Sequence, residues 1–588
     1  MTQKTLVTTA LEVTWPEDGP LLFLGSWCRS FSRQEFWSSL DYETVPYHWD
    51  NRQKLARDYK NLELIYEVFL SKFSEKLNHT HKVTQSERFW RILIGPWLYT
   101  FVQVVFDRWY MLNRAVKNRE VLRIKIIDGH FSQLVTHDIG SFNDAIETDK
   151  WNEALCSLLV TMFLNDKILI TYVTKSDVHE RHSVENKRHT TLKSMLIKLS
   201  NSVSRMFTGD GGVFVIAPHM SFWRQVLLHL KLRQLPTFWF GEPENCSIKD
   251  LSPTRDTVTL DCASNIIPDF ESVLNAIAYR LMPEIYLEGF QSLLDSSKMQ
   301  GWPNNPSAIY TCNSYSSNET FKCWAGCQVD AGSKLVIGQH GGNFGMTPMA
   351  IHETHQIKIS DKWFSWGWED VSQPKIIPVG NFKSKLTRLK NRSTGDVLLV
   401  SMTLSRFSYY LYSVPIAGQV GSYLDDQLDF ARTLTDEIRQ RLRVRLYPND
   451  RGWDQKARWL SFHEQITFDS NRRSLIHSLR DSRIFVGTYN ATTYLETFSA
   501  NMPSILFWNP NHWEVTAEAG YYFQRLKDVG ILHDSPKSAA RHLIKIWDSV
   551  DEWWFSDLVQ EVVLDFSYNY SQNNPQIIDS IVKHLKSD

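Results

Sequence analysis

Short runs of apolar and β-branched residues alternate with amphipathic helical stretches along most of the chain. The runs expected to form strands are 167–173, 213–218, 334–338, 356–360, 396–402, 443–448, 484–487 and 504–508. The intervening helices are expected at 187–206, 271–281, 424–441 and 492–500. Strands separated by helices form βαβ units and pair in parallel. The pattern predicts an α/β protein with two successive Rossmann-like, doubly wound domains.

The first 120 residues follow a different pattern, which is mainly helical after an opening strand expected at 21–25. Apolar residues recur there at three- and four-residue steps, namely Leu55, Tyr59, Leu62, Tyr66, Phe69, Phe73 and Leu77. Such spacing is typical of an amphipathic helix. Thr84 and Glu87 have the spacing of a capping box, which predicts the start of a second helix. We therefore expect a helical region over about 50–120.

Length and charge exclude several classes of protein. A chain of 588 residues exceeds one ordinary core, so we expect two domains, 1–378 and 379–588, with the last helices packing back on the first. A polar stretch at 383–394 follows the expected boundary. The 64 Lys and Arg residues against 65 Asp and Glu residues give a net charge of -1, which argues against a dedicated nucleic-acid binder.

The sequence predicts a cytoplasmic protein. Glu12, Glu17 and Asp18 lie where a signal peptide needs an apolar region. Seven cysteines in so long a chain fit reduced thiols better than a disulfide scaffold. The most apolar stretch, 92–106, is shorter than the ~20 residues of a spanning helix. We expect a buried helix there, with an interfacial membrane contact as the alternative.

The strongest local motif is Gln339-His340-Gly341-Gly342, which follows the apolar run 334–338. Paired glycines allow backbone N–H groups to approach an anion, and the carboxyl ends of parallel strands are where α/β sheets bind ligands. Gly341 and Gly342 are therefore candidates for binding a donor nucleotide, and His340 for a general base or a phosphate-binding group. The alternative is a tight turn with a histidine bonded to the backbone.

Two carboxylates and a group of tryptophans follow this motif. Glu353 is expected on a short helix and Asp361 at the end of the next strand, both facing the same crevice as His340. Either could act in base catalysis or could instead cap a helix or turn. Trp366 and Trp368 are candidate platforms for an acceptor sugar, with core packing as the alternative.

A second motif follows the apolar run 484–487. Asn490, Thr492 and Thr493 supply amide and hydroxyl groups around a helix start, which suits a phosphate. Glu496 lies four residues after Thr492 on the same helix face and could accept hydrogen bonds from ribose hydroxyls. The alternative is an N-capped helix whose Glu496 is solvated or paired with an arginine.

Other strand ends add candidates to the site. Arg445 and Tyr447 end a strand of the second domain and could contact the donor nucleotide, although a surface ion pair explains the arginine equally well. Asn313 could line the cleft from the first domain on the acceptor side. No Walker A loop, no GxGxxG after a strand and no convincing zinc set occur, so we expect no metal site.

Together these motifs resemble a family of bacterial surface-carbohydrate transferases encoded in O-antigen clusters. The likeness includes 24–28, 47–50, 339–342, 360–361, 366–368, 380–381 and 490–496. It implies a GT-B glycosyltransferase in which two Rossmann-like domains face a cleft and the C-terminal one holds the donor nucleotide. Members of the family often accompany genes for nonulosonic or other ulosonic acids, whose activated donors are CMP-sugars.

A more distant likeness is to the glycerol- and ribitol-phosphate transferases of teichoic acid synthesis. Their Trp-His-Gly, Ser-Asp and Asp-Tyr-Ser-Ser motifs are similar to His340-Gly341, Ser360-Asp361 and 490–493. Gln339 replaces the tryptophan here, and threonines replace the serines. Both relatives use cytidine nucleotides, so the resemblances imply a cytidine-activated donor.

These resemblances imply a metal-independent transfer, without a cofactor, from a CMP-sugar to a glycan or a lipid-linked glycan. The donor phosphate would rest near Thr492 and Thr493, with Glu496 on the ribose. His340 and one carboxylate would deprotonate or position the acceptor hydroxyl, and backbone amides and basic side chains would take the charge of the leaving CMP. A lipid-linked acceptor would bring the protein to the inner face of the cytoplasmic membrane. A polyol-phosphate transferase, a nucleotide-sugar epimerase and a non-catalytic carbohydrate-binding protein stay open as alternatives.

Overall fold

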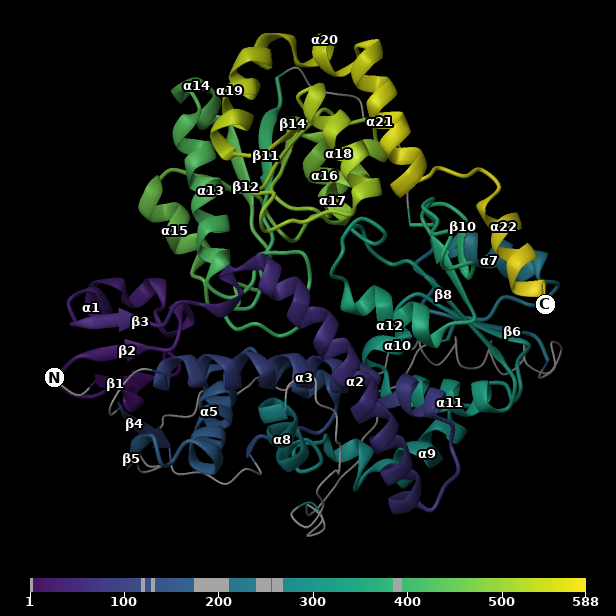
Figure 1. The fold of residues 1–588 in the computed structure, drawn as a ribbon. Coiled ribbons are helices and arrows are strands. Elements are labelled where there is room, and N and C mark those ends of the chain that lie inside the picture. Colours follow the sequence, from purple (N-terminus) through teal and green to yellow (C-terminus); the bar gives the residue numbers. More distant parts are fainter. Residues whose placement is uncertain are drawn as a thin grey trace.

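The computed structural model describes residues 4–117, 122–127, 133–173, 211–239, 255, 268–383 and 394–587. The strands of these residues form three sheets, in which all pairings are parallel. In Figure 1 the first sheet lies at the lower left, the second at the right and the third in the upper lobe. The helix expected at 187–206 lies outside the described residues.

The first sheet has the order β3-β2-β1-β4-β5, and the second has the consecutive order β10-β9-β8-β7-β6. Strands of the first sheet are β1 Lys4–Val7, β2 Leu21–Phe23, β3 Tyr42–Thr44, β4 Leu122–Ile127 and β5 Ile168–Val173. Strands of the second are β6 Val213–Ile216, β7 Ala308–Thr311, β8 Lys334–Gly338, β9 Lys362–Ser365 and β10 Ile376–Pro378. Two sheets thus precede the chain's entry into the third.

The third sheet has the doubly wound order β13-β12-β11-β14-β15-β16. Its strands are β11 Asp396–Val400, β12 Leu442–Arg445, β13 Thr467–Phe468, β14 Ser482–Gly487, β15 Ser504–Phe507 and β16 Leu532–His533. The strand order reverses between β11 and β14, which is the position where open α/β sheets bind ligands beyond their carboxyl ends.

Helices connect and cover the three sheets. Those before the third sheet are α1 Gln34–Ser38, α2 Arg52–His81, α3 Glu87–Val116, α4 Ile139–Ala145, α5 Asp149–Phe163, α7 Phe222–Lys231, α8 Pro268–Ile277, α9 Phe290–Met299, α10 Ser314–Ser317, α11 Glu319–Asp330 and α12 Ile351–Ile359. Those after β11 are α13 Gln419–Thr433, α14 Asp436–Gln440, α15 Gln455–Phe462, α16 Leu475–Arg480, α17 Thr492–Ser499, α18 Ala517–Asp528, α19 Pro536–Ile546, α20 Val550–Trp554, α21 Asp557–Tyr570 and α22 Ile577–Lys586. The yellow α21 descends from the upper lobe in Figure 1, and α22 packs against α7 beside the second sheet.

The predicted α/β class is confirmed, because helices connect the parallel strands of all three sheets, and a cleft lies between the second and third sheets. The strands predicted at 21–25 and 167–173 are confirmed as β2 and β5 of the first sheet. Their pairing in one sheet was not predicted, because the long helices α2 and α3 separate β4 and β5 from the other strands. The division into two domains at 378 and 379 stays a prediction, since the segment before it carries two sheets.

Three local predictions are wrong. Residues 356–359 belong to α12 instead of a strand, because Ile351, His355 and Ile359 are buried at helical spacing. The stretch 424–441 is divided into α13 and α14, since Thr435 starts a new helix by accepting a hydrogen bond from the Ile438 N–H. The third wrong prediction is Thr84 as the cap of α3.

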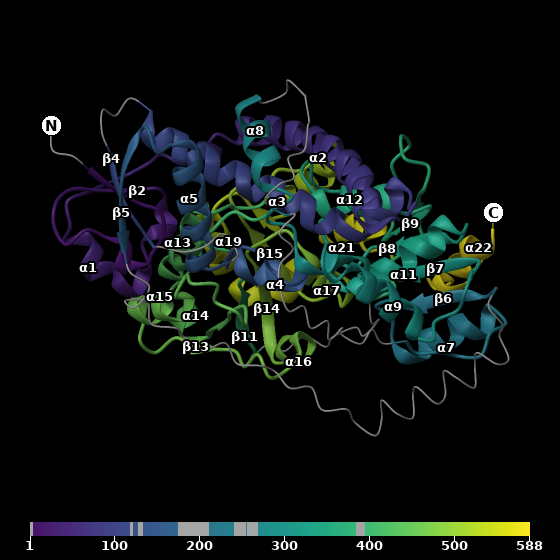
Figure 2. The ribbon, with the colours of Figure 1, turned by 90° about the horizontal axis from the view of Figure 1, so that it is seen from below.

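The two long helices α2 and α3 connect the region of the first sheet with that of the second (Figure 2). All seven apolar residues predicted on one face of α2 are buried, which confirms that helix. The cap of α3 is Ser86, whose hydroxyl accepts from the Phe89 N–H at 3.0 Å, instead of Thr84. Within the described part of the chain, α3 alone is long and apolar enough to cross a membrane, but 94% of its apolar window is buried. The predicted buried helix at 92–106 is therefore confirmed.

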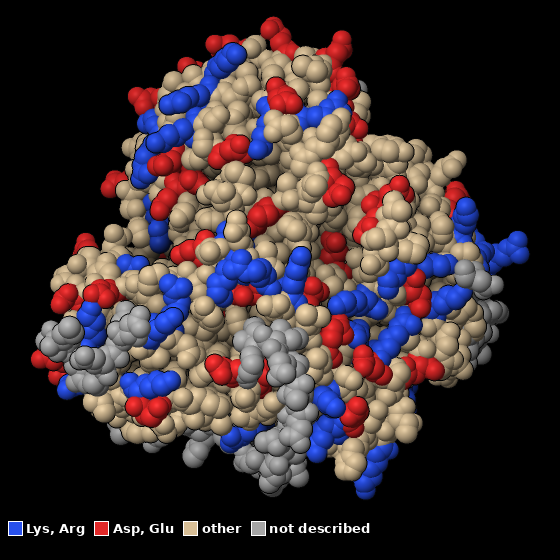
Figure 3. Space-filling view, in the orientation of Figure 1, with Lys and Arg blue, Asp and Glu red and all other residues tan. Residues whose placement is uncertain are grey.

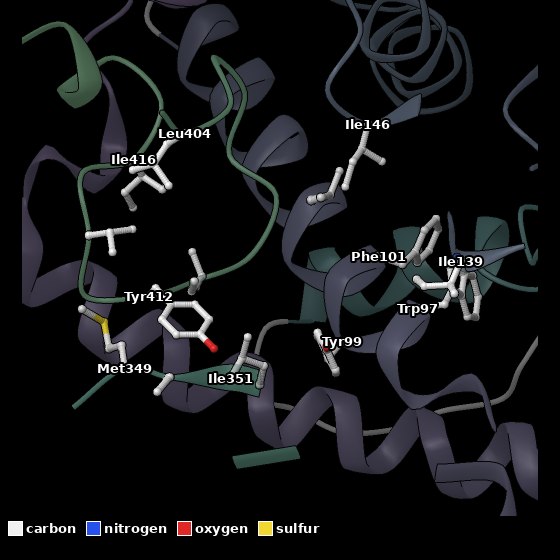
Figure 4. Close-up of a cluster of buried hydrophobic side chains, with 14 of the residues drawn as sticks. Trp97, Tyr99, Phe101, Ile139, Ile146, Met349, Ile351, Leu404, Tyr412 and Ile416 are labelled. Atoms are coloured by element: carbon white, nitrogen blue, oxygen red, sulfur yellow. The ribbon is translucent and has the colours of Figure 1, made fainter. Parts of the chain in front are cut away.

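The loop 401–417 after β11 connects the third sheet with the helices below it. Gln103 of α3 accepts a hydrogen bond from the Leu411 N–H at 2.7 Å, and Arg108 donates to the Ser408 carbonyl at 2.7 Å. Figure 4 shows Leu404, Tyr412 and Ile416 of this loop above Met349 and Ile351. Buried polar bonds and apolar packing therefore hold the two sides of the cleft together.

Charged side chains do not gather by sign on the face drawn in Figure 3, where Lys and Arg are interspersed with Asp and Glu. This distribution accords with the near-zero net charge of the chain.

Candidate functional site

A cavity of about 190 Å³ lies between the second and third sheets, at the carboxyl ends of β8 and β14. Its lining residues come from three parts of the chain: His340, Gly341, Gly342, Asn343, Phe344 and His352; Met402, Leu404, Tyr410, Tyr412 and Val414; Asn490, Ala491 and Trp513. Both motifs singled out in the sequence thus lie in the wall of the same cavity. We call this space the central cavity.

The glycine turn after β8 contacts the start of α17 directly. The Gly342 N–H donates to the Thr492 hydroxyl at 2.8 Å. A Cβ at Gly342 would lie 2.7 Å from the Ala491 carbonyl carbon and the Thr492 nitrogen. Glycine is therefore required here because the two backbones meet with no room for a side chain.

Asn490 precedes α17 and is 1% exposed. Its Oδ1 accepts a hydrogen bond from the Tyr494 hydroxyl at 3.0 Å, but its Nδ2 has no partner. Ala491, the N-cap of α17, makes no side-chain cap bond. A buried amide donor beside a helix N-terminus provides partners for an anion or for the polar edge of a base.

His340 lies at the end of β8, and its Nδ1 is a buried atom without a hydrogen-bond partner. Burial, together with His352, His219 and Lys383, lowers the pKa of His340 to about 3. Burial also lowers the pKa of His352 to about 4. Both imidazoles are therefore neutral at pH 7, and each can accept a proton on a ring nitrogen.

The sequence did not single out His352 or the loop 401–417. The ring centre of His352 lies 4.6 Å from that of Tyr410 and 5.4 Å from that of Tyr412. The available signal for His352 was its position beside Glu353 in α12. The loop offered none, because its contact with α12 depends on the packing of the third sheet against the second.

Glu353, the predicted catalytic carboxylate on α12, accepts a hydrogen bond from the Gly345 N–H at 2.7 Å. Burial raises the pKa of Glu353 to about 8 despite this hydrogen bond, which favours the ionised form. At neutral pH the side chain therefore holds a proton. It lies one residue from His352 in the chain, and the described contacts do not join it to His340.

The predicted position of Asp361 is wrong. Its carboxylate forms two hydrogen bonds with the Arg88 guanidinium, at 2.7 and 3.1 Å, and accepts the Leu335 N–H at 2.7 Å. Leu335 lies near the amino end of β8, whereas His340 follows its carboxyl end. The helix α12 returns the chain to the amino edge of the sheet before β9 begins, so Asp361 connects α3 to this edge.

A second cavity, of about 560 Å³, is lined by His219, Met220, Ser221, Phe222, Arg224, Phe382 and Lys383. The ring centre of His219 lies 6.3 Å from that of His340, so the two spaces adjoin at these histidines. The Asn313 side chain is hydrogen-bonded to His219, which brings this predicted residue to the site. The carboxylate of Glu496 lies 3.6 Å from the ammonium group of Lys383. We call this space the basic cavity.

The two predicted aromatic platforms are inside the protein. Trp366 is fully buried and Trp368 is 8% exposed, and their indole N–H groups donate to Gln339 at 3.0 Å. They hold the strand end that carries His340, instead of offering a ring face to a sugar.

Three further candidates lie around the third sheet. Arg445 is paired with Asp469 at 2.5 Å and donates to the Arg473 carbonyl, which agrees with the ion-pair alternative. Tyr447 is 46% exposed. Its charge interaction contributes to the raised pKa values of Tyr410 and Tyr489. Thr493 shares a hydrogen bond of 2.6 Å with the Tyr489 hydroxyl.

Comparison with solved structures gives distant likenesses, among them the following three chains. MurG of Acinetobacter baumannii matches at a TM-score of 0.30 and 9% identity, over 67% of this chain and 95% of that one. WaaG, a glycosyltransferase involved in lipopolysaccharide biosynthesis, matches at 0.27 and 10%, over 51% and 96%. UGT89C1 of Arabidopsis thaliana, complexed with quercetin, matches at 0.27 and 10%, over 66% and 96%.

No curated protein matches the chain in sequence. One family model does match, over residues 4–585, and it describes a transferase. The match includes the central cavity and all three sheets. The chain therefore belongs to the LIC12162 family of transferases.

Proposed function

We propose that this transferase is a glycosyltransferase of surface-polysaccharide synthesis that moves a nonulosonic or other ulosonic acid from a CMP-activated donor to a glycan acceptor. The observation that carries the proposal is the 2.8 Å bond between the Gly342 N–H and the Thr492 hydroxyl. This bond holds His340, which follows β8, and the N-terminus of α17 in the wall of one cavity. A leaving group at the helix and an acceptor at the histidine would then face each other.

The donor phosphate lies at the start of α17 in this proposal. The Asn490 Nδ2 supplies a hydrogen bond to the phosphate or to the cytosine, and the helix N-terminus stabilises the charge of the leaving CMP. In this proposal the carboxylate of an ulosonic acid binds in the basic cavity, where Arg224 supplies a positive charge and Lys383 would exchange its 3.6 Å pairing with Glu496 for the carboxylate of the sugar. The binding of both groups uses side chains of this chain, without a metal.

His340 is the proposed base for the acceptor hydroxyl. Its lowered pKa of about 3 makes this imidazole a weak base. A bound donor phosphate would raise this pKa, because a nearby negative charge favours the imidazolium. The base thus becomes effective when the donor is present, which limits proton transfer in the absence of substrate.

The test is calorimetric binding of CMP, CDP, UMP, UDP and GDP to the wild-type protein and to Asn490→Asp. The substitution keeps the oxygen that accepts from Tyr494 and replaces the amide donor by a carboxylate oxygen. We expect CMP to bind in preference to the other nucleotides, and at least 10-fold more weakly to the variant. Asn165→Asp, at an exposed asparagine between α5 and β5, is the control and is expected to bind CMP like the wild type.

Preference for UDP or GDP would overturn the cytidine donor, and equal binding by Asn490→Asp would remove that residue from the site. Donor consumption with and without a glycan acceptor tests the reaction type. Acceptor-dependent release of CMP supports transfer, whereas conversion of the sugar without an acceptor would indicate an epimerase.

A further inference from the structure

A third cavity, of about 440 Å³, lies between the first sheet and the start of α13. Its polar lining residues are Ser26, Thr44, Asp50, Gln419, Ser422 and His512. None of the predicted site residues belongs to this wall. We call it the lateral cavity.

The position of the lateral cavity is one where α/β proteins bind ligands. Ser26 and Thr44 lie at or just after the carboxyl ends of β2 and β3 in a parallel sheet. The opposite wall belongs to the third sheet's region, and a Cβ at Gly418 would lie only 2.3 Å from the Ser26 hydroxyl. The cavity thus lies at a close contact between two parts of the fold, and its volume is in the range of small-molecule sites.

The charges of the wall disfavour an anion. Asp50 contributes a carboxylate to the lining. The nearby Arg52 guanidinium is engaged by both Glu514 oxygens, at 2.6 and 2.8 Å, and donates to Gln419 and to the Val414 carbonyl. With this cation neutralised and an acidic group at the wall, a phosphate or a nucleotide would meet net repulsion.

The polarity of the wall disfavours a lipid chain and suits a neutral sugar. Ser26, Thr44 and Ser422 have hydroxyl groups that both donate and accept hydrogen bonds. Asp50 accepts hydrogen bonds from hydroxyl donors, and His512 provides a ring nitrogen of either kind. A polyhydroxyl ligand matches such alternating donors and acceptors.

We propose that the lateral cavity is a second carbohydrate site, which binds a neutral sugar unit. The loop after β15 separates it from the central cavity, because His512 lines the lateral cavity and the next residue, Trp513, lines the central one. A sugar bound there contacts the same loop that forms a wall of the central cavity. The site requires no transfer reaction, so it is independent of the proposed donor.

The experiment measures binding of galactose, N-acetylglucosamine, rhamnose and maltose by saturation-transfer NMR and calorimetry. Ser422→Trp fills the cavity from α13. Arg432→Trp is the matched control, because it adds the same side chain ten residues further along the helix, about 15 Å away. We expect at least one sugar to bind the wild type and Arg432→Trp equally, and Ser422→Trp at least 10-fold more weakly.

CMP binding provides the second measurement. It is expected to be equal in the three proteins, which shows that Ser422→Trp folds and that the two sites are separate. The proposal is overturned if no sugar of the panel binds the wild type, if sugar binding survives Ser422→Trp, or if inorganic phosphate competes with the sugar. If the wild type does not bind CMP, the proposed donor is contradicted. The sugar-binding result then tests the lateral cavity by itself.

Discussion

The polar side chains at the two edges of the second sheet differ in whether their hydrogen bonds are satisfied. At the amino edge, both carboxylate oxygens of Asp361 accept hydrogen bonds, from the Arg88 guanidinium and from the Leu335 N–H. At the carboxyl edge, His340 has a buried ring nitrogen without a partner, and the facing Asn490 has a buried amide without one. Buried polar groups are costly when unpaired, and the proposed donor nucleotide would supply partners for those at the carboxyl edge. Saturation of hydrogen bonds, more than residue type, distinguishes the two edges.

The largest expected effect is at the contact between the carboxyl edge and the third sheet. Gly342→Ala introduces a Cβ 2.7 Å from backbone atoms of Ala491 and Thr492, and backbone cannot move aside as a side-chain end can. We expect the two sides of the central cavity to separate, with a loss of transfer activity of at least about 100-fold. Steady-state kinetics measures the loss.

Gly421→Ala is the matched control for this change. A Cβ there meets nothing within 4 Å, and the residue lies inside α13. The control should keep its activity and gain up to about 1 kcal/mol of stability, because alanine is the better helix former. Equal activity of Gly342→Ala and Gly421→Ala would show that the contact at Thr492 is dispensable.

His340→Ala is expected to lower kcat by about 10²- to 10⁴-fold, the usual contribution of a general base, while the protein stays folded. The comparison of edges predicts this separation of activity from stability, since the His340 Nδ1 has no partner in the fold and the ring loses only its hydrogen bond with the Cys312 backbone. The measurement is kcat together with thermal unfolding at pH 7. Full turnover in a folded variant would remove His340 from the mechanism.

Asp361→Asn, at the amino edge, should lower the stability of the protein and leave kcat unchanged. The substitution removes the charge that Arg88 pairs with and weakens three hydrogen bonds, all of them in the folded protein. Because both side chains are about 34% exposed, we expect a loss of about 2 kcal/mol in the free energy of unfolding, with kcat unchanged. Urea unfolding at pH 7 measures this loss. A large fall in kcat with unchanged stability would restore Asp361 to the catalytic site.

The sequence predicted the central cavity better than the edges around it. The strand ends at His340 and Asn490 were identifiable because an apolar run followed by glycines or hydroxyl residues is typical of a strand end that binds a ligand. Asp361 was misplaced because the alternating residues of 356–360 have the period of a strand, whereas the burial of Ile351 and Ile359 shows a helix. One wrong element moved the carboxylate to the other edge of the sheet.

Tertiary contacts explain the remaining misses. Trp366 and Trp368 have the residue type of a sugar platform, but both donate to Gln339, whose amide lies inside the protein. The pairing of the first sheet escaped prediction because β1 and β4 pair across more than a hundred residues that include α2 and α3. A local pattern contains no information about such pairings, since they form only when the long helices pack.

The last expected effect is a dependence of stability on pH, and it concerns Glu353, which lies in α12 between the two edges. Its pKa is about 8 in the folded protein, against an ordinary value of 4.5. The protein therefore keeps a proton between these pH values that the unfolded chain releases. This contribution to stability is fully present below pH 4.5 and is lost as the pH rises through 8.

Glu353→Gln keeps the acceptor for the Gly345 N–H but cannot ionise, so its stability relative to wild type should increase over this range. We expect the gain to grow by about 3–4 kcal/mol between pH 5 and pH 8, because each unit of pKa shift corresponds to ~1.4 kcal/mol. Unfolding at pH 5, 6.5 and 8 measures it, with the exposed Glu369→Gln as the control for the change of side chain. A stability difference that does not vary with pH would show that Glu353 is ionised in the folded protein, and it would then match the saturated carboxylate of the amino edge.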